Sequence, residues 1–162
     1  MPSLSRHTTA TPSLLDKLFD DDPKSPFDRS DAIAFDLARY KKSVARDLEA
    51  LLNSRCPDID GSIENSTHAR TSMLNFGIID LSSLSLLNTD DRALLRDKIR
   101  LTIERHEPRL AKVRVSLDAP QGAERMLRFR VDAVLKVHPS RPPVSFDAML
   151  QLSSNTCSIN ER

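Results

Sequence analysis

The chain has 162 residues, and its 24 Lys and Arg side chains against 23 Asp and Glu give a net charge of +1. This length fits one domain, and the balanced charge leaves no overall electrostatic footprint for nucleic acid. Glycine-rich phosphate loops are excluded as well, because only three glycines occur and neither a GxGxxG nor a GxxxxGK pattern is present. Two well-separated cysteines, no signal-like start and no long apolar run predict a cytoplasmic protein with no membrane insertion.

The N-terminal region, residues 1–26, is predicted to be flexible. Residues 1–13 are rich in Ser, Thr and Pro, and the apolar island "SLLDKLF" at 13–19 precedes an acidic spacer that contains proline. The island either folds back on its own domain or docks on a partner and becomes ordered only then. Its large apolar side chains, which would make that contact, are Leu14, Leu15, Leu18 and Phe19.

The first helix is predicted to begin at about Phe35 or Arg39 and to end at Arg55. Its apolar residues recur at i, i+4, i+7 and i+8, the spacing of a helix that covers a core on one side. They are Val44, Leu48, Leu51 and Leu52. The remaining positions carry charged side chains, which we interpret as a solvated face.

A second helix is predicted from Thr89, as its N-cap, to Glu107-Pro108, because proline disfavours helical geometry for the residue before it. Its expected buried stripe is Leu94, Leu95, Ile99 and Ile103. Between the two helices, residues 62–88 lack long periodicity. From Ser72 onward they predict a short strand, a tight turn at 75–77 and then a helical turn after Asp80.

Three strands are predicted after the second helix, because apolar and polar residues alternate over 113–117, 127–137 and 144–152. Such alternation indicates an antiparallel sheet that is covered on one side only. The predicted fold class is therefore α+β, with N-terminal helices packed on one face of a small C-terminal antiparallel sheet. We assign residues 27–153 to this domain and treat 154–162 as a C-terminal tail.

No metal or cofactor site is predicted, because the four histidines are scattered and form no HExxH motif. Glu104 and Glu107 offer an alternative as a glycoside hydrolase. At i, i+3 on a helix their carboxyl groups come within roughly 5–6 Å, close to the separation in a retaining glycosidase. Such an enzyme also needs a sugar cleft with aromatic platforms, and the chain has one Tyr and no Trp. We therefore predict no catalytic residue and no enzymatic activity.

The triplet Glu107-Pro108-Arg109 lies where the second helix gives way to the first strand. Once Pro108 has ended the helix, the side chains of Glu107 and Arg109 point to the same side of an extended stretch. The two charges either pair with each other and fix an exposed corner, or each meets an opposite charge on a partner. The residues alone favour the internal pair. At an exposed corner, replacing Arg109 by Ala should change stability by no more than about 0.5 kcal/mol.

The order of four segments resembles one known family. The segments are "SVARDLEALLNSR" (43–55), "SMLNFGIIDLSSLS" (72–85), "IRLTIERHEPRLAKVRVSL" (99–117) and "LRFRVDAVL" (127–135). In this order they resemble the baseplate wedge protein of contractile phage tails and, more closely, the TssE family of type VI secretion systems. The apolar island near the N-terminus is also typical of that family.

The resemblance implies a structural protein and not an enzyme. It implies a place in the baseplate wedge with TssF and TssG, in contact with TssK, at the cytoplasmic side of the inner membrane. It also implies a sheet that templates the TssB–TssC sheath by strand addition. In that family Glu107, Pro108 and Arg109 would contact the wedge, which favours the partner-binding interpretation of the corner. A free-standing regulatory adaptor on the same fold, which binds one partner through this corner, is a further alternative.

Overall fold

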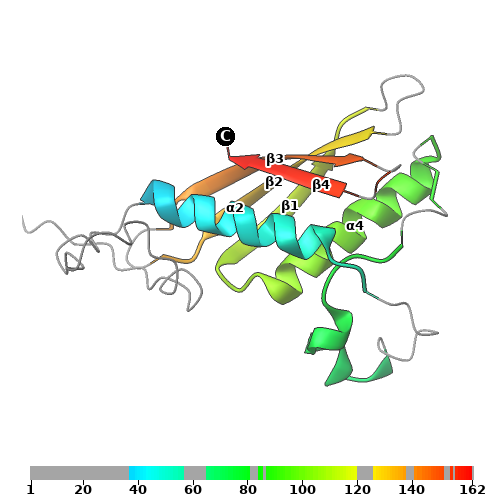
Figure 1. The fold of residues 1–162 in the computed structure, drawn as a ribbon, viewed down its shortest axis with the longest axis horizontal. Coiled ribbons are helices and arrows are strands. Elements are labelled where there is room, and N and C mark those ends of the chain that lie inside the picture. Colours follow the sequence, from blue (N-terminus) through cyan, green and yellow to red (C-terminus); the bar gives the residue numbers. More distant parts are fainter. Residues whose placement is uncertain are drawn as a thin grey trace, which may run out of the picture.

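The computed structural model describes residues 37–56, 65–80, 84–85, 87–119, 126–137, 141–151, 154 and 156–161. Over these residues, α-helices precede an antiparallel sheet in the chain (Figure 1). The helices are α2 (Leu37–Asn53), the short 3-10 helices η2 (Ala69–Thr71) and η3 (Met73–Asn75), and α4 (Thr89–His106). The strands are β1 (Leu110–Leu117), β2 (Met126–Leu135), β3 (Pro143–Gln151) and β4 (Thr156–Glu161).

Helix α2 forms where the apolar spacing predicts it, and it ends two residues earlier, at Asn53. Its buried residues are Val44, Ala45, Leu48, Leu51 and Leu52. They include every residue of the predicted stripe, so the prediction of one core-facing side is confirmed. At the C-terminal end, the backbone N–H of Ser54 donates to the carbonyl of Ala50 (3.1 Å) and so continues the helical pattern for one residue.

Helix α4 begins at Thr89, but its N-cap is Asn88, whose side chain accepts a hydrogen bond from the N–H of Asp90 (3.0 Å). The predicted cap at Thr89 is therefore one residue too late. The predicted stripe is confirmed at three positions and wrong at Leu94, which is 45% exposed. Successive residues turn by about 100°, which places Leu94 well away from the other three. The buried residues are Leu95, Ile99 and Ile103.

The four strands form an antiparallel meander in the order β1-β2-β3-β4. Helix α2 packs along β4 and α4 packs along β1, so both helices cover the same face of the sheet (Figure 1). Along β2 and β3, buried positions alternate with positions that are exposed or half-buried. The fold is therefore α+β with a one-sided antiparallel sheet, as the alternation predicts.

The prediction of a C-terminal tail at 154–162 is wrong, because residues 156–161 form β4 and pair with β3. Cys157 and Ile159 are buried in the core, whereas the residues between and after them point to solvent. The alternation is present in the sequence, but two apolar residues are too few to indicate a strand without the neighbouring strand in view.

The segment between the helices returns to the end of α2. The predicted short strand at its start is wrong, because residues 73–75 form η3. Gly77 has a φ of 105°, and the next residue, Ile78, exchanges backbone hydrogen bonds with Ser54 and Cys56 (both 3.0 Å). Ile78 is thereby buried in the core. The predicted helical turn after residue 80 falls largely on 81–83, outside the described residues.

Candidate functional site

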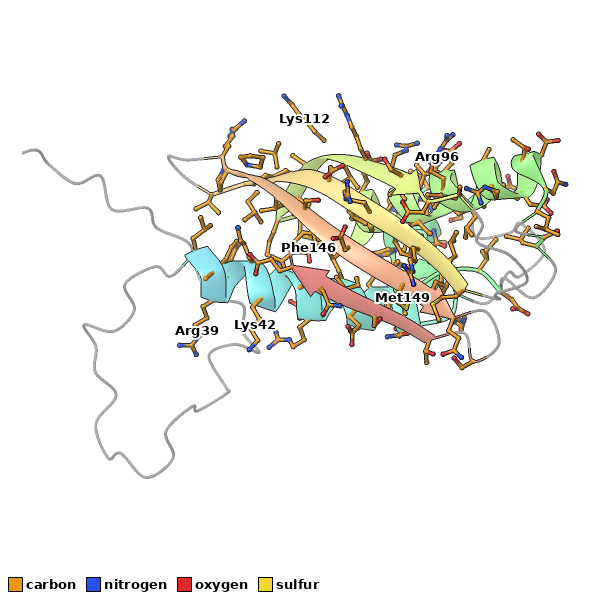
Figure 2. The ribbon with its side chains drawn as sticks, turned by 90° about the horizontal axis from the view of Figure 1, so that it is seen from above. Arg39, Lys42, Arg96, Lys112, Phe146 and Met149 are labelled. Atoms are coloured by element: carbon orange, nitrogen blue, oxygen red, sulfur yellow. The ribbon has the colours of Figure 1, made fainter. Side chains whose placement is uncertain are left out.

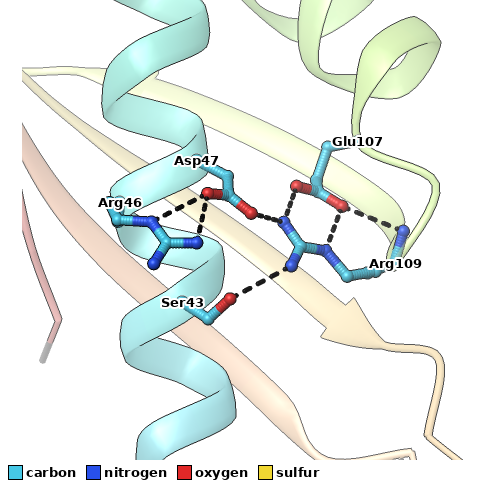
Figure 3. A network of polar contacts seen from close by, with 5 residues as sticks. All are labelled: Ser43, Arg46, Asp47, Glu107 and Arg109. Carbon is cyan, nitrogen blue, oxygen red and sulfur yellow. Dashed lines mark hydrogen bonds and ion pairs between the residues drawn. The ribbon is translucent and has the colours of Figure 1, made fainter. Parts of the chain in front are cut away.

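Glu107 and Arg109 form a bidentate ion pair at the joint between α4 and β1 (Figure 3). The Nε of Arg109 donates to Oε1 of Glu107 (2.7 Å), and its Nη2 donates to Oε2. The backbone N–H of Arg109 also donates to Oε1 (3.1 Å). Because Pro108 stops the helix between them, both side chains lie on one side of the chain, as the sequence predicts.

A second carboxylate holds the same guanidinium from α2. Nη2 of Arg109 donates to Oδ2 of Asp47 (2.7 Å), and Nη1 donates to the hydroxyl of Ser43 (3.4 Å) (Figure 3). The other carboxylate oxygen of Asp47 accepts two bonds from Arg46 (3.0 and 2.9 Å). The network therefore ties α2 to the α4–β1 joint. The sequence analysis missed Asp47 because the charged residues outside the apolar stripe were interpreted as a solvated face, and it gave no signal for Ser43.

The corner is less exposed than predicted. Glu107 is only 4% exposed and is the buried charged residue among those that the structure describes. The side chain of Arg109 is 19% exposed and that of Asp47 is 30% exposed. An ion pair with one fully buried member is costly to break from one side, so the expectation of at most about 0.5 kcal/mol for Arg109→Ala no longer holds. Pro108 is the member of the triplet that lies exposed.

The surroundings keep Arg109 charged. Burial lowers the pKa of its guanidinium, but the hydrogen bonds and charges of Glu107 and then of Asp47 outweigh this effect and raise the pKa above its ordinary value. The ring of Tyr40 on α2 lies against the guanidinium, with 5.9 Å from Cζ to the ring centroid. The site can therefore supply a fixed, planar hydrogen-bond donor, not a group that exchanges protons near neutral pH.

The carboxylate pair of the hydrolase alternative does not form one site. Glu104 lies on the exposed surface of α4 and pairs with Arg100 (2.8 Å). Glu107 is buried and held by Arg109, so it is not free to protonate a leaving group. Each glutamate thus has its own ion-pair partner, one on the surface of α4 and one at the corner. This arrangement does not support the glycosidase interpretation.

The other candidate residues have structural roles. Nε2 of His106 lies 2.8 Å from the carbonyl oxygen of Asn75, and its ring meets Phe76 edge-on. Both cysteines are buried as free thiols, and burial raises the pKa of Cys157 to about 12. Within the described ranges, no three His, Cys, Asp or Glu side chains are placed to hold a metal ion.

The predicted apolar island with Leu14, Leu15, Leu18 and Phe19 lies outside the described residues. A helix long and apolar enough to cross a membrane is not found among the residues that the structure covers. The Glu107-Pro108-Arg109 corner with Asp47 is thus the charged cluster that the structure offers as a candidate site.

The family model described as baseplate wedge protein gp25 matches residues 38–140, more than half of the chain. The chain belongs to the gp25 family of baseplate wedge proteins. The matched region runs from α2 to residue 140, between β2 and β3 in the chain, and includes both α-helices, the corner and the first two strands. Comparisons with curated proteins and with solved structures find no match.

Membership in the wedge family indicates a structural role in a phage-tail-like baseplate and contact with other baseplate or tail proteins. The geometry of the corner agrees with this role, because its charged groups hold helices and sheet together and are not arranged around an open reaction site. Family membership also accounts for the order of segments that the sequence analysis singled out.

Proposed function

We propose that this protein is the TssE-like subunit of a type VI secretion baseplate, at the cytoplasmic side of the inner membrane. In this role it is held by the TssF–TssG wedge, next to TssK, and templates assembly of the TssB–TssC sheath. The observation that carries the proposal is a gp25-family chain whose small antiparallel sheet ends in two edge strands, β1 and β4. An edge strand carries unpaired backbone groups, to which a strand of another protein can add with little sequence demand.

The corner is proposed as a contact with the wedge. Glu107 is buried and serves to hold the guanidinium of Arg109, so the surface offered to a partner consists of exposed Pro108, the accessible part of Arg109 and Asp47. A partner carboxylate that approaches Arg109 would meet a donor already fixed in position, which lowers the entropy cost of binding. The same corner would hold α2 in the orientation that the wedge receives.

The N-terminal island is proposed as a second contact with the wedge. Leu14, Leu15, Leu18 and Phe19 form a short apolar run ahead of a charged spacer that contains proline. Such a run can lay its apolar side chains into a groove of a partner. Together, the apolar run and the charged corner would give two linked contacts, whose combined affinity exceeds that of either one.

The test is co-purification from cells that build the machine, with fluorescent sheath assembly as the second measurement. A tagged Pro108→Ala variant removes the exposed ring but none of the charged groups of the corner, and Arg96→Ala, which removes an exposed pair with Asp97, is the control. We expect Arg109→Ala to lose TssF and TssG, because its binding free energy falls by about 2–5 kcal/mol. Pro108→Ala should bind these partners more weakly than the wild type, and the control should bind them equally well. Glu107→Arg should be worse than Glu107→Ala, because it places like charges together.

Several outcomes would contradict the proposal. A stable complex with a single partner, without wedge or sheath proteins, would indicate the regulatory adaptor instead. Turnover of purified peptidoglycan that is lost in Glu104→Gln would indicate the hydrolase. Normal co-purification of folded Arg109→Ala and Glu107→Arg would show that the corner only stabilises its own fold.

A further inference from the structure

Side chains of α2 occupy the outer edge of β4. The side-chain amide of Asn53 pairs with both backbone groups of Cys157: its Nδ2 donates to the carbonyl (2.9 Å), and its Oδ1 accepts from the N–H (2.7 Å). A neighbouring strand would make the same two hydrogen bonds. At this point Asn53 therefore takes the place of a fifth strand.

The same helix continues along the edge in register. The carboxylate of Glu49 accepts from the N–H of Ile159 (2.9 Å), and Lys41 pairs with the side chain of Glu161 (3.1 Å). Four residues of a helix advance about 6 Å, and two residues of a strand advance about 6.7 Å. The four-residue step from Asn53 to Glu49 thus matches the two-residue step from Cys157 to Ile159 on β4, and Lys41, eight residues before Glu49, reaches the side chain of Glu161 at the end of the strand. This arrangement covers the β4 edge, a recognised means of preventing unwanted strand pairing.

The opposite edge, on β1, has no such cover among the described residues. The bonds from Lys136 N–H to the carbonyl of Arg109 (2.8 Å) and from Asp118 N–H to the carbonyl of Arg128 (2.9 Å) fix which β1 residues face β2. By the alternation of an antiparallel pair, the backbone groups of Val115 and Leu117 face outward. No hydrogen bond to these groups is made by any residue that the structure describes outside the sheet.

A bulge limits how much of the β1 edge is regular. The register with β2 shifts between Ala111 and Arg114, and Lys112 has a φ of 55°. Bulges and lysines at an edge both oppose pairing with another strand. The regular part therefore runs over residues 114–117. Lys112 extends from this side of the sheet, opposite to α2 (Figure 2).

The solvent face near β1 is basic. Four cations of this region lie exposed and have no ion-pair partner within the described residues: Lys112, Arg114, Arg128 and Lys136. Of the nearby acids, Asp147 pairs with Arg130 (3.0 Å) and Asp118 acts on the same guanidinium, whereas Asp132 lies opposite Arg114 in the register with β2 and forms no ion pair with it. An acidic segment laid along β1 would thus be attracted, and a basic one would be repelled.

The proposed function requires a sheath strand that adds to the sheet, and this inference rests on it. We propose that this strand adds to β1, over residues 114–117, and not to β4. The strand is extended, with acidic side chains on the solvent face beside Arg114 and apolar side chains on the face toward α4. There they continue the core at Val115 and at half-buried Leu117. Because helix α2 covers the edge at β4, a further strand can pair with the sheet only at β1.

Amide hydrogen exchange of the whole protein, read at single residues, tests this edge assignment. In the free protein the amides of Val115 and Leu117 should exchange fast, and those of Cys157 and Ile159 slowly, because α2 accepts or shields the latter. Adding purified sheath subunits of the same machine should slow the exchange of the Val115 and Leu117 amides by at least about tenfold. Slow exchange of these two amides in the free protein, or new protection confined to β4, would overturn the inference.

Charge variants give a second measurement that does not depend on exchange. Arg114→Glu should weaken sheath binding about tenfold, whereas Lys42→Glu, the same change in charge on exposed α2 (Figure 2), should not. Equal effects of the two variants would overturn the β1 assignment while sheath binding itself stands. If wild-type protein binds no sheath subunit at all, the proposed function falls and this inference falls with it.

Discussion

Arg109 is held by two carboxylates that reach it from different parts of the chain, Glu107 two residues before it and Asp47 on α2. The local pair follows from the proline between Glu107 and Arg109. The pair with Asp47 depends on how α2 packs over the sheet. A guanidinium can satisfy both at once, because its planar fork offers several donors in fixed directions.

We predict that Arg109→Ala lowers the free energy of unfolding of the isolated protein by about 3 kcal/mol, since it leaves the buried Glu107 without its cation. Arg109→Lys should lose less, because lysine retains the charge but cannot bridge both carboxylates. Chemical denaturation of both variants measures this. In Arg96→Ala, which breaks an exposed pair, the change should stay within about 0.5 kcal/mol. Equal shifts for Arg109→Ala and Arg96→Ala would show that the corner adds no stability.

Cys157 gives the protein a pH dependence on the alkaline side. Burial first, and then the charge of Glu49, raise the pKa of the thiol from 9.0 to about 12. A group whose pKa is higher in the folded state stabilises the fold fully at pH values below its unfolded pKa. This stabilisation is lost as the pH rises from the unfolded pKa to the folded pKa. Between pH 8 and pH 10 the free energy of unfolding should fall by about 1 kcal/mol for this group. The slope should be smaller in Cys157→Val, and an unchanged slope would exclude the thiol as its source.

Among the secondary-structure elements, helix α2 contacts the rest of the molecule through more than its apolar stripe. Its buried side packs on the sheet, Asp47 holds the α4–β1 joint, and Glu49 and Asn53 cover β4. The segment before α4 is held at the end of the same helix, through the backbone hydrogen bonds of Ile78 with Ser54 and Cys56. Residues that a helical wheel assigns to solvent thus connect most of the other elements.

Gly77 is the position at which this return segment allows no side chain. Its φ of 105° disfavours any other residue, and an added Cβ would lie 2.4 Å from the carbonyl oxygen of Ser54. We predict that Gly77→Ala destabilises the protein by about 2 kcal/mol or more, measured by thermal and chemical unfolding. Leu74→Ala, three residues earlier and 58% exposed, is the control and should change stability by less than about 0.5 kcal/mol. A neutral Gly77→Ala would mean that the segment adapts without cost.

At the scale of the whole molecule, the described core draws on both helices and all four strands. It therefore contains the parts of a self-sufficient domain without the N-terminal region. We predict that deletion of residues 1–19 leaves one cooperative thermal transition, near that of the full chain, and weakens only wedge assembly. Circular dichroism melting and co-purification measure the two effects. Loss of the transition would place the apolar island in the core.

Features that depend only on the local order of residues could be predicted from the sequence. Periods of 3.6 and 2 identified both helices and the first three strands, and Pro108 fixed the end of α4 and brought Glu107 and Arg109 to one side. These patterns also indicated the fold class, because one apolar face per element requires helices on one side of a sheet.

Which distant groups meet depends on how the helices pack on the sheet, and this could not be predicted from the sequence. Asp47 pairs with Arg109 across 62 positions, and Asn53 pairs with Cys157 across 104. Neither pairing leaves a local pattern, since a polar residue opposite an apolar stripe looks the same whether it faces water or a strand edge. β4 was not predicted for a related reason. Its two buried residues can be recognised as part of a strand only when β3 and α2 are known to lie beside them. Burial of Glu107 likewise results from the packing of helices and sheet around it, which periodicity does not encode.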